Sequence, residues 1–466
     1  MRSSLKIIPS VHEIFSSERF GKLLEKYPRE IVLNFTREYL QVIRQKMQQG
    51  QEVSEQLAID HLSAEVESRL ESLLQPKIFS VINATGILLH TNLGRAPMAE
   101  VASQAAKLAA ESYLNLEMDL ATGKRSHRTS VIRALLQTLI NCESATVVNN
   151  NAAATVLVLK VLAQGCEVLV SRGELVEIGG GFRIPEIMAC SGAILKEVGS
   201  TNITRISDYE RGISSNTALI MRVHTSNYRI QGHTHTPELK ELVELSHSKG
   251  IPFVDDIGSG SLIDMSHWGL NDEPLAKESL NAGADLVLFS GDKLMGGPQS
   301  GIIAGNSKLV NQIENDPLMR AFRVDKMSLA ALEATLRLYV VPDNALNSIP
   351  HFRMLEASIS GLQERAYLLA RLFGNLPGFS VHVVPSEAYV GGGSLPACAI
   401  PSFSLAIYSE HSSEEELARR LRLHSPAILT RIEAGKIIVD LRTVLPEQDQ
   451  FLVEALKTAL VAKHGK

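Results

Sequence analysis

A lysine and a pair of aspartates follow apolar runs of this sequence. Together these residue types can act on a carbonyl compound. Lys293 follows the apolar run Leu286–Ser290 and precedes a glycine-rich segment, Gly296-Gly-Pro298. A lysine that a buried strand delivers into a glycine-lined loop loses hydration, which lowers its pKa and makes its amine a nucleophile. Taken alone, the motif is more typical of a solvent-facing lysine at a strand end.

The paired acids end a second apolar run, Pro252–Asp256. A strand-end aspartate can pair with the ring nitrogen of pyridoxal 5′-phosphate (PLP) and keep it protonated, so that the ring accepts carbanion electrons. Asp255 matches that position, and Asp256 is the alternative. Adjacent aspartates can also bind a metal or cap a helix, but no third oxygen ligand stands at an obvious spacing, and we assign no metal.

A phosphate anchor would complete such a site, and the segment Val147–Thr155 has the composition for one. A strand there passes through an asparagine-rich turn into small residues that open a helix. Backbone N–H groups at a helix N-terminus bind phosphate, and small side chains allow close approach. Alone, the turn is only a helix cap; in order with the aspartates and the lysine it predicts a PLP site. The expected phosphate-binding residues are Asn150, Asn151, Ala152 and Ala153.

These motifs lie between about residues 80 and 305, where short β-branched runs alternate with amphipathic segments such as Pro237–Lys249. The alternation predicts a doubly wound, mostly parallel sheet, on which ligands bind at the carboxyl ends of strands. A long helix is expected around Met327–Tyr339, followed by a smaller α+β domain. The predicted strands of the large sheet are Ala145–Val148, Glu167–Ser171, Ala193–Val198, Ala218–His224, Pro252–Asp256, Leu286–Ser290 and Gly301–Ala304.

The first 75 residues carry apolar residues at helical spacing and no strand signal, which predicts a helical domain. Residues 1–50 hold nine Lys or Arg and five Glu, a net charge of +4. A solvated helix face and a binding surface explain that charge equally well. We therefore expect three domains, at 1–75, 76–340 and 341–466.

Composition limits the class of protein. The 466 residues include 46 Lys and Arg and 51 Asp and Glu, a net charge of −5, and 45% are hydrophobic. These values exclude disordered, collagen-like and disulfide-framework proteins and differ from those of a broadly basic nucleic-acid binder. No apolar run approaches the ~18 residues of a membrane span, and the N-terminus lacks a signal-peptide core, so we expect a cytoplasmic enzyme. The four cysteines stand alone, without metal-ligand spacing.

Several longer strings together resemble the bacterial selenocysteine synthase family, the L-seryl-tRNA(Sec) selenium transferases. The resemblance covers essentially the whole chain, and the strings are long and unusual in composition. They are residues 83–97, 149–154, 179–185, 223–230, 254–260, 290–293, 322–326 and 438–444.

The resemblance implies an α/β PLP-dependent transferase of fold type I, the aspartate-aminotransferase type, with a small helical N-terminal domain and an α+β C-terminal domain. It implies conversion of L-seryl-tRNA(Sec) to L-selenocysteinyl-tRNA(Sec). Lys293 would bind PLP and remove the Cα proton, the hydroxyl would leave to give an aminoacrylyl-tRNA, and selenium from selenophosphate would add. Asp292 would assist proton transfer or loss of the hydroxyl, or simply cap its loop.

The resemblance also implies partners. The N-terminal domain would recognise tRNA, and the chain would form at least a dimer and, as in the family, a ring of dimers (a homodecamer). Selenophosphate is a small multiply charged anion, which guanidinium groups suit. If a helix follows Asp316-Pro317, Arg320 and Arg323 lie on one face of that helix. The candidates are Arg95, Arg128, Arg320 and Arg323, each of which alone is more typical of a surface ion pair.

Two other functions fit parts of the pattern. A PLP-dependent lyase or aminotransferase acting on a free small amino acid or an amino-sugar acid would hold the substrate carboxylate with Arg431 or Arg442. The helical N-terminal segment favours tRNA, because a lyase has no need of it. A non-catalytic tRNA-binding protein on a PLP fold is disfavoured, because Lys293, Asp255 and the phosphate turn are all intact.

Overall fold

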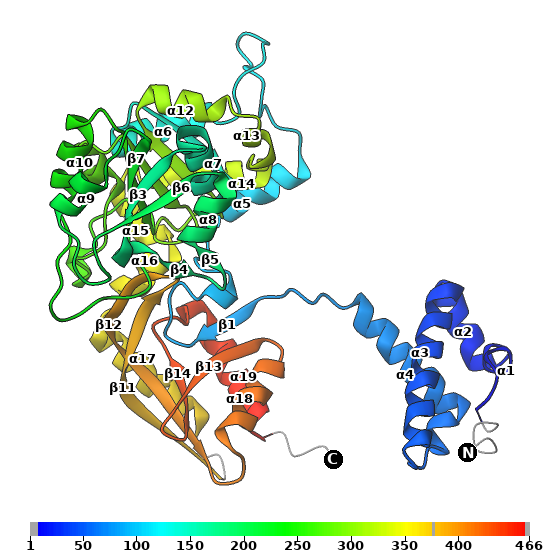
Figure 1. Cartoon of the computed structure of the whole chain (residues 1–466). Helices are drawn as coiled ribbons and strands as arrows, with labels where there is room; N and C mark the ends of the chain where they lie inside the picture. Colours follow the sequence, from blue (N-terminus) through cyan, green and yellow to red (C-terminus); the bar gives the residue numbers. More distant parts are fainter. Residues whose placement is uncertain (1–7, 375–377, 462–466) are drawn as a thin grey trace. The chain divides into compact units, whose positions relative to one another are not determined.

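The N-terminal part of the chain forms a compact helical unit of its own. The computed structural model describes residues 8–374 and 378–461, and the chain divides into units Met1–Ser80 and Val81–Lys466 (Figure 1). The first unit has its own apolar core, which includes Phe20, Val32 and Val66. Its helices are α1 (Val11–Phe15), α2 (Glu18–Lys26), α3 (Arg29–Gln48) and α4 (Ile59–Leu74).

The second unit contains a seven-stranded sheet in the order β2-β10-β9-β8-β7-β3-β6. Only β10 runs antiparallel to its neighbours, and the other pairings are parallel. The predicted mostly parallel sheet is confirmed, and every predicted strand is present within two residues at each end. The strands are β2 (Ser144–Val148), β3 (Glu167–Ser171), β6 (Ile194–Val198), β7 (Thr217–Val223), β8 (Phe253–Gly258), β9 (Leu286–Ser290) and β10 (Gly301–Gly305).

Both faces of this sheet are covered, because the strand side chains alternate between two cores. Leu286 and Leu288 pack in the core that contains helix α7, whereas Val287 and Phe289 pack in the core on the other face. The helices of this domain are α5 (Glu100–Glu111), α6 (Ser130–Ile140), α7 (Asn151–Ala163), α8 (Ile184–Ser191), α9 (Ile206–Gly212), α10 (Leu239–Ser248), α11 (Ala276–Asn281), α12 (Ser307–Glu314), α13 (Leu318–Ala321), α14 (Lys326–Leu338), α15 (Pro342–Ser348) and α16 (Pro350–Glu356). A two-stranded ribbon joins β4 (Glu177–Ile178) to β5 (Phe182–Arg183).

A second sheet, in the order β1-β13-β14-β12-β11, forms the smaller domain, with helices packed on it (Figure 1). Strand β1 (Val81–Ala84) lies in this sheet, parallel to β13, although the sequence places it with residues 76–340. Ile82 and Ala84 are buried in the small-domain core, which explains the pairing. The other elements are α17 (Ile359–Phe373), β11 (Phe379–Gly391), β12 (Ser394–Ser409), α18 (Glu414–Leu423), β13 (Ala427–Glu433), β14 (Lys436–Asp440) and α19 (Asp449–Val461).

Candidate active site

The motifs met in the sequence converge at one end of the large sheet. Strands β8 and β9 are parallel neighbours, and helix α7 begins just after β2. The carboxyl ends of parallel strands meet at one edge of a sheet, where ligands bind in open α/β folds. A pocket of about 240 Å³ opens there. Its polar lining includes Arg95, Asn150, Asn151, Ser226, Asp256, Asp292 and Lys293.

Lys293 lines this pocket and lies three residues after β9 ends. Its side chain is only 4% exposed. Burial and, next, the positive charge of Arg95 lower the pKa of Lys293 from its usual value. A larger share of the amine is therefore neutral near neutral pH, which is the form that attacks a carbonyl.

The two adjacent aspartates face different surroundings. Asp256 lines the pocket, where its carboxylate accepts hydrogen bonds from Asn151 Nδ2 at 2.8 Å and Thr155 Oγ1 at 3.1 Å. Asp255 instead accepts two hydrogen bonds from Arg222 on the neighbouring strand, at 2.7 and 2.6 Å. Successive side chains of a strand point to opposite faces, so the backbone allows only one of the two to face Lys293. Asp256, the alternative in the sequence analysis, is the one that does.

Burial also changes the pKa of Asp256. Desolvation raises the pKa of Asp256 to about 6, although its hydrogen bonds from Asn151 and Thr155 and the nearby Lys293 oppose the rise. A cationic ring nitrogen placed beside Asp256 would hold this carboxylate ionised. The donor set thus suits a protonated heterocycle.

The asparagine-rich turn forms the start of helix α7, as predicted. Asn150, Asn151 and Ala152 line the pocket. The Asn150 side chain accepts the N–H of Ala153 at 2.8 Å, so this N–H is already used by the helix cap. The first-turn N–H groups of Asn151 and Ala152 are the better candidates for a phosphate than that of Ala153.

Arg95 reaches the pocket from a segment far away in sequence. Its Nη1 donates to Asp292 Oδ2 at 2.7 Å, and Asp292 is the residue before Lys293. The Arg95 backbone has a φ of 63°, which is unusual for a residue with a side chain. The Ala96 N–H also donates to the Asp292 carbonyl oxygen at 3.3 Å. Arg95 and Asp292 are therefore held together in the lining of the Lys293 pocket.

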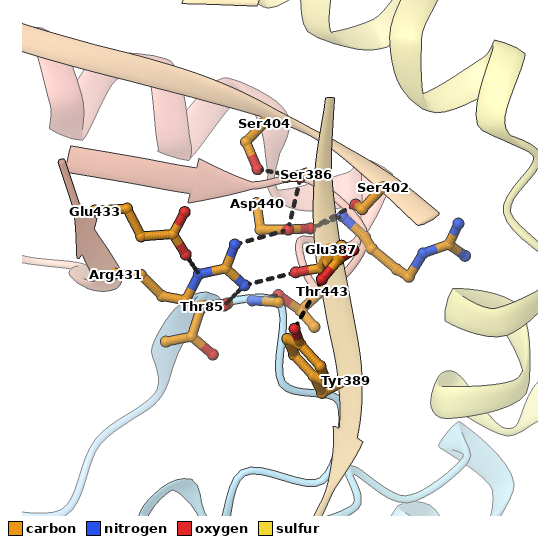
Figure 2. A network of polar contacts seen from close by, with 12 residues as sticks. Thr85, Ser386, Glu387, Tyr389, Ser402, Ser404, Arg431, Glu433, Asp440 and Thr443 are labelled. Atoms are coloured by element: carbon orange, nitrogen blue, oxygen red, sulfur yellow. Dashed lines mark hydrogen bonds and ion pairs between the residues drawn. The ribbon is translucent and has the colours of Figure 1, made fainter. Parts of the chain in front are cut away.

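A polar network in the small domain holds the segment that leads to Arg95 (Figure 2). Arg431 Nη1 donates to the carbonyl oxygens of Thr85, at 2.7 Å, and Glu387, at 2.9 Å. The buried Asp440 lies 3.6 Å from Arg431 Nη2. Gly86, with a φ of 77°, has no room for a side chain, because an added Cβ would lie 2.6 Å from Arg431 Nη1. The segment after β1 is thus fixed by small-domain contacts.

The same contacts involve Arg431, one of the two arginines that a lyase would need to hold its substrate carboxylate. Arg431 is engaged with this network, and neither it nor Arg442 lines the Lys293 pocket. Arg442 donates to backbone oxygens, among them Met354 O at 2.6 Å and Pro401 O at 2.6 Å. Both guanidinium groups serve the small domain itself.

The other three predicted arginines line a different cavity, of about 760 Å³. Arg128 donates to Glu117 and to Val324 O, the latter at 2.9 Å. Arg320 lies on helix α13, which ends at Ala321, so Arg323 is not on that helix and the expected shared helix face is wrong. Arg323 follows the helix end and lies 3.8 Å from the Glu117 carboxylate. Within the described residues, no side chain lines both this cavity and the Lys293 pocket.

Ser226 is a further pocket residue that is not among those predicted from the sequence. Its hydroxyl is buried, lines the Lys293 pocket and has no hydrogen-bond partner among the described residues. A Cβ added at Gly258 would lie 3.9 Å from both Lys293 Nζ and Ser226 Oγ, so these atoms border one small space. The signal was present, since Ser226 belongs to the string 223–230, but a serine there has no feature that separates it from its neighbours.

These features fit a phosphorylated pyridine cofactor. A buried lysine of lowered pKa, an aspartate for a cationic ring nitrogen, a helix N-terminus and an unpartnered hydroxyl converge on one pocket. On a doubly wound sheet this set defines a PLP-dependent enzyme of fold type I. The solved structure of D-glucosaminate-6-phosphate ammonia-lyase shares the fold, with a TM-score of 0.57 and 18% identity over 84% of this chain and 97% of that one.

Comparison with known proteins identifies the family. The family described as SelA, L-seryl-tRNA selenium transferase, matches residues 81–445. A protein named L-seryl-tRNA(Sec) selenium transferase from Carboxydothermus hydrogenoformans is 47% identical over 98% of each chain. One of the same name from Aquifex aeolicus is 43% identical over 99% of this chain and 100% of its own. The chain belongs to the L-seryl-tRNA(Sec) selenium transferase family, and its cofactor is pyridoxal phosphate.

Proposed function

We propose that this chain converts L-seryl-tRNA(Sec) to L-selenocysteinyl-tRNA(Sec), replacing the seryl hydroxyl by selenium. Family membership over nearly the whole length supports the reaction. The observation that carries the proposal is the pocket next to the start of helix α7. The buried residues Lys293 and Asp256 both line this pocket.

Each group of the pocket has a proposed part. Lys293 would hold PLP covalently, Asp256 the ring nitrogen, and the first turn of α7, at Asn151 and Ala152, the phosphate. When bound, the cofactor supplies an electron sink for the carbanion at the serine Cα. Lys293, with its lowered pKa, is suited to accept the Cα proton once its amine is free.

Arg95 and Asp292 are the remaining charged groups of the pocket. Arg95 uses one N–H on Asp292, which leaves further donors of its planar group for an anion. We assign Asp292 to orienting Arg95 and to relaying the proton that Lys293 takes from Cα to the seryl hydroxyl, which then leaves as water. Its position next to Lys293 in the chain supports this assignment.

Selenophosphate is the proposed selenium donor, with Arg95, Arg128, Arg320 and Arg323 as its candidate ligands. The last three line a cavity apart from Lys293. They would meet a Lys293 pocket if a neighbouring subunit presents them, and closed symmetric assembly repeats such a contact at every site. The proposed assembly is therefore a homo-oligomer of at least two chains, with a ring of dimers as the larger form.

The helical N-terminal unit is the proposed tRNA reader. It has its own core, so it can keep its fold while carrying a recognition surface. We keep the three proposed tasks: tRNA recognition at 1–75, PLP binding in the domain predicted at 76–340, and a small domain predicted at 341–466. The structure moves two boundaries, because β1 belongs to the small domain and α15 and α16 pack with the large-sheet domain. None of the described helices combines the length and apolar character of a membrane span, and we place the reaction in the cytoplasm with its tRNA substrate.

The lyase alternative receives less support. A free amino acid or sugar acid has a carboxylate that needs a cationic partner, and both arginines assigned to that task are bound elsewhere. An aminoacyl-tRNA carries an ester at this position and needs no such clamp.

The test is conversion of charged tRNA. Purified enzyme with PLP, seryl-tRNA(Sec) and selenophosphate is expected to form selenocysteinyl-tRNA(Sec), and free serine is expected to give little pyruvate. Pyruvate from free serine or from an amino-sugar acid, without reaction on charged tRNA, would favour the lyase.

A further inference from the structure

A second polar cavity adjoins the Lys293 pocket and has no part in the chemistry described so far. Its volume is about 310 Å³. It shares Val223 and His224 with the Lys293 pocket, so the end of strand β7 forms a common wall. The His224 N–H donates to the Asp256 carbonyl oxygen at 2.9 Å, which ties this wall to the strand that carries Asp256.

The substrate dictates what must lie beside the catalytic pocket. In seryl-tRNA the seryl carbonyl is esterified to the ribose of the 3′-terminal adenosine. When the serine amine and Cα are at Lys293, the ribose is therefore one ester bond away. A cavity that shares two wall residues with the catalytic pocket is within that reach.

The cavity lining suits a nucleoside. Tyr228 lines the cavity, packs against the neighbouring apolar core and donates its hydroxyl to Gly173 O. Stacking on aromatic rings held in this way is a common means of binding unpaired nucleotides. Thr225, Thr234 and Thr236 line the same space, and threonine hydroxyls can exchange hydrogen bonds with a ribose or a base edge. Burial and the nearby Arg222 lower the pKa of His224 to about 4, so the imidazole at the common wall is neutral.

The cavity lining also includes an exposed cation. Arg229 lines the cavity and pairs with Asp272, and the two side chains are 44% and 62% exposed. An ion pair so exposed contributes little stability, and a phosphodiester can take the place of the carboxylate.

We propose that this cavity binds the 3′-terminal adenosine of the aminoacyl-tRNA, with Tyr228 against the base and Arg229 at the adjoining phosphate. The proposal rests on the proposed function and extends it by naming a substrate subsite. The terminal nucleoside thereby fixes the seryl ester across the end of β7, in front of Lys293.

Two minimal substrates test the proposal: 2′(3′)-O-L-seryladenosine and L-serine methyl ester, each with selenophosphate and the PLP-loaded enzyme. Both present the same seryl ester, and only the first carries the nucleoside. We expect kcat/KM for seryladenosine to exceed that of the methyl ester by about tenfold or more. Equal values for the two esters, in an enzyme that converts seryl-tRNA(Sec), would overturn the subsite proposal and leave the proposed function standing. Failure on seryl-tRNA(Sec) itself would overturn the proposed function.

Cavity-filling variants locate the effect. Cys398 lines the cavity, and C398F is expected to lower kcat/KM for seryladenosine about tenfold while the methyl ester is little affected. The matched control is C190F, since Cys190 is exposed on helix α8 and outside the cavity lining. Y228L is expected to act like C398F, whereas Y228F retains the ring and most of the preference. Equal losses on both esters in C398F would contradict the assignment.

A binding measurement without turnover uses the same cysteines. Adenosine 5′-monophosphate is expected to slow alkylation of Cys398 by iodoacetamide severalfold and to leave Cys190 unchanged, as followed by peptide mass spectrometry of the holoenzyme. Equal labelling of Cys398 with and without the nucleotide, at concentrations up to several millimolar, would count against the subsite.

Discussion

The Lys293 pocket differs in its charges from the cavity lined by Arg128, Arg320 and Arg323, which we call the arginine cavity. In the pocket, Lys293 and Asp256 are buried, 4% exposed each, and their pKa values move toward the neutral forms. In the arginine cavity, Arg323 is 41% exposed and shares Glu117 with Arg128. Arg128 lowers the pKa of Glu117, which stays ionised.

The difference corresponds to two tasks. Buried groups with shifted pKa values can take up or release protons near neutral pH, which chemistry requires. Open guanidinium groups retain their charge and can exchange a carboxylate for another anion. The pocket is therefore suited to the proposed bond-making and the cavity to the proposed anion capture, and each prediction below tests one of these two roles.

The largest effect is expected from K293A. Loss of the amine removes both the attachment point of the cofactor and the base, so we expect activity to fall by about 10⁴-fold or more. The absorbance band near ~420 nm of the lysine-bound cofactor should vanish as well. The control is K308A, which removes an exposed lysine on helix α12. A K293A protein that keeps covalently attached PLP would remove Lys293 from its assigned role.

Substitutions of the two adjacent aspartates should have different effects, one on activity and the other on stability. D256N is expected to lower kcat by about 10²–10³-fold, because the ring nitrogen loses its carboxylate partner. D255N leaves the Arg222 guanidinium without its charged partner and is expected to lower the unfolding free energy by about 3 kcal/mol. Kinetics and urea unfolding of both holoenzymes measure the two effects. The reverse pattern would return the ring-nitrogen role to Asp255.

The raised pKa of Asp256 predicts a pH effect on the cofactor-free protein. Its folded pKa, about 6, exceeds its ordinary value of 3.8. Between these values the folded state binds more protons than the unfolded state, so this group's contribution to stability is present at low pH and is lost as pH rises. The loss should reach about 3 kcal/mol by pH 7. The wild type minus D256N difference, from urea unfolding at pH 4 to 7, isolates this contribution, and a difference independent of pH would contradict it.

Substitutions in the arginine cavity should weaken selenophosphate binding without changing how the cofactor is bound at Lys293. The R320A/R323A double variant is expected to raise KM for selenophosphate by tens of fold, since two charge-assisted contacts are lost, with the ~420 nm band unchanged. If a partner subunit presents the cavity, refolding K293A together with R320A/R323A should restore about a quarter of the wild-type rate. Half of the dimers then contain one chain of each variant. In each such dimer, one of the two sites has both an intact Lys293 and an intact arginine cavity. Activity no greater than that of the separate variants would place both parts in one chain.

The smallest effect concerns the small-domain network that fixes the approach to Arg95. T443V removes the hydroxyl that accepts the Gly86 N–H at 3.0 Å, and R431K removes contacts to Thr85 and Glu387. We expect kcat to fall about two- to tenfold, as for coupled neighbours. The midpoint of a pH titration of the ~420 nm band should move in the same direction as in R95K, because Arg95 acts on Lys293. R365K, in a separate small-domain ion pair with Asp449, should leave the midpoint unchanged.

The sequence alone determined the sheet and the cofactor, and it singled out Lys293 as the candidate cofactor-binding lysine. Apolar strands ending in Lys293 and in paired aspartates, and a strand–turn–helix at Asn150, are local patterns whose meaning survives any tertiary arrangement. The long strings that carry the family resemblance are likewise linear, and the comparisons confirm them.

Tertiary structure decided which groups meet. The choice between Asp255 and Asp256 depends on the face toward which each side chain points, and adjacent identical residues carry no sequence signal for it. The separation of Arg95 from the other arginines, the pairing of β1 with β13 and the cavity beside His224 join segments far apart in the chain. Composition was least informative about tRNA, because a whole-chain charge of −5 averages over domains whose binding surfaces are local.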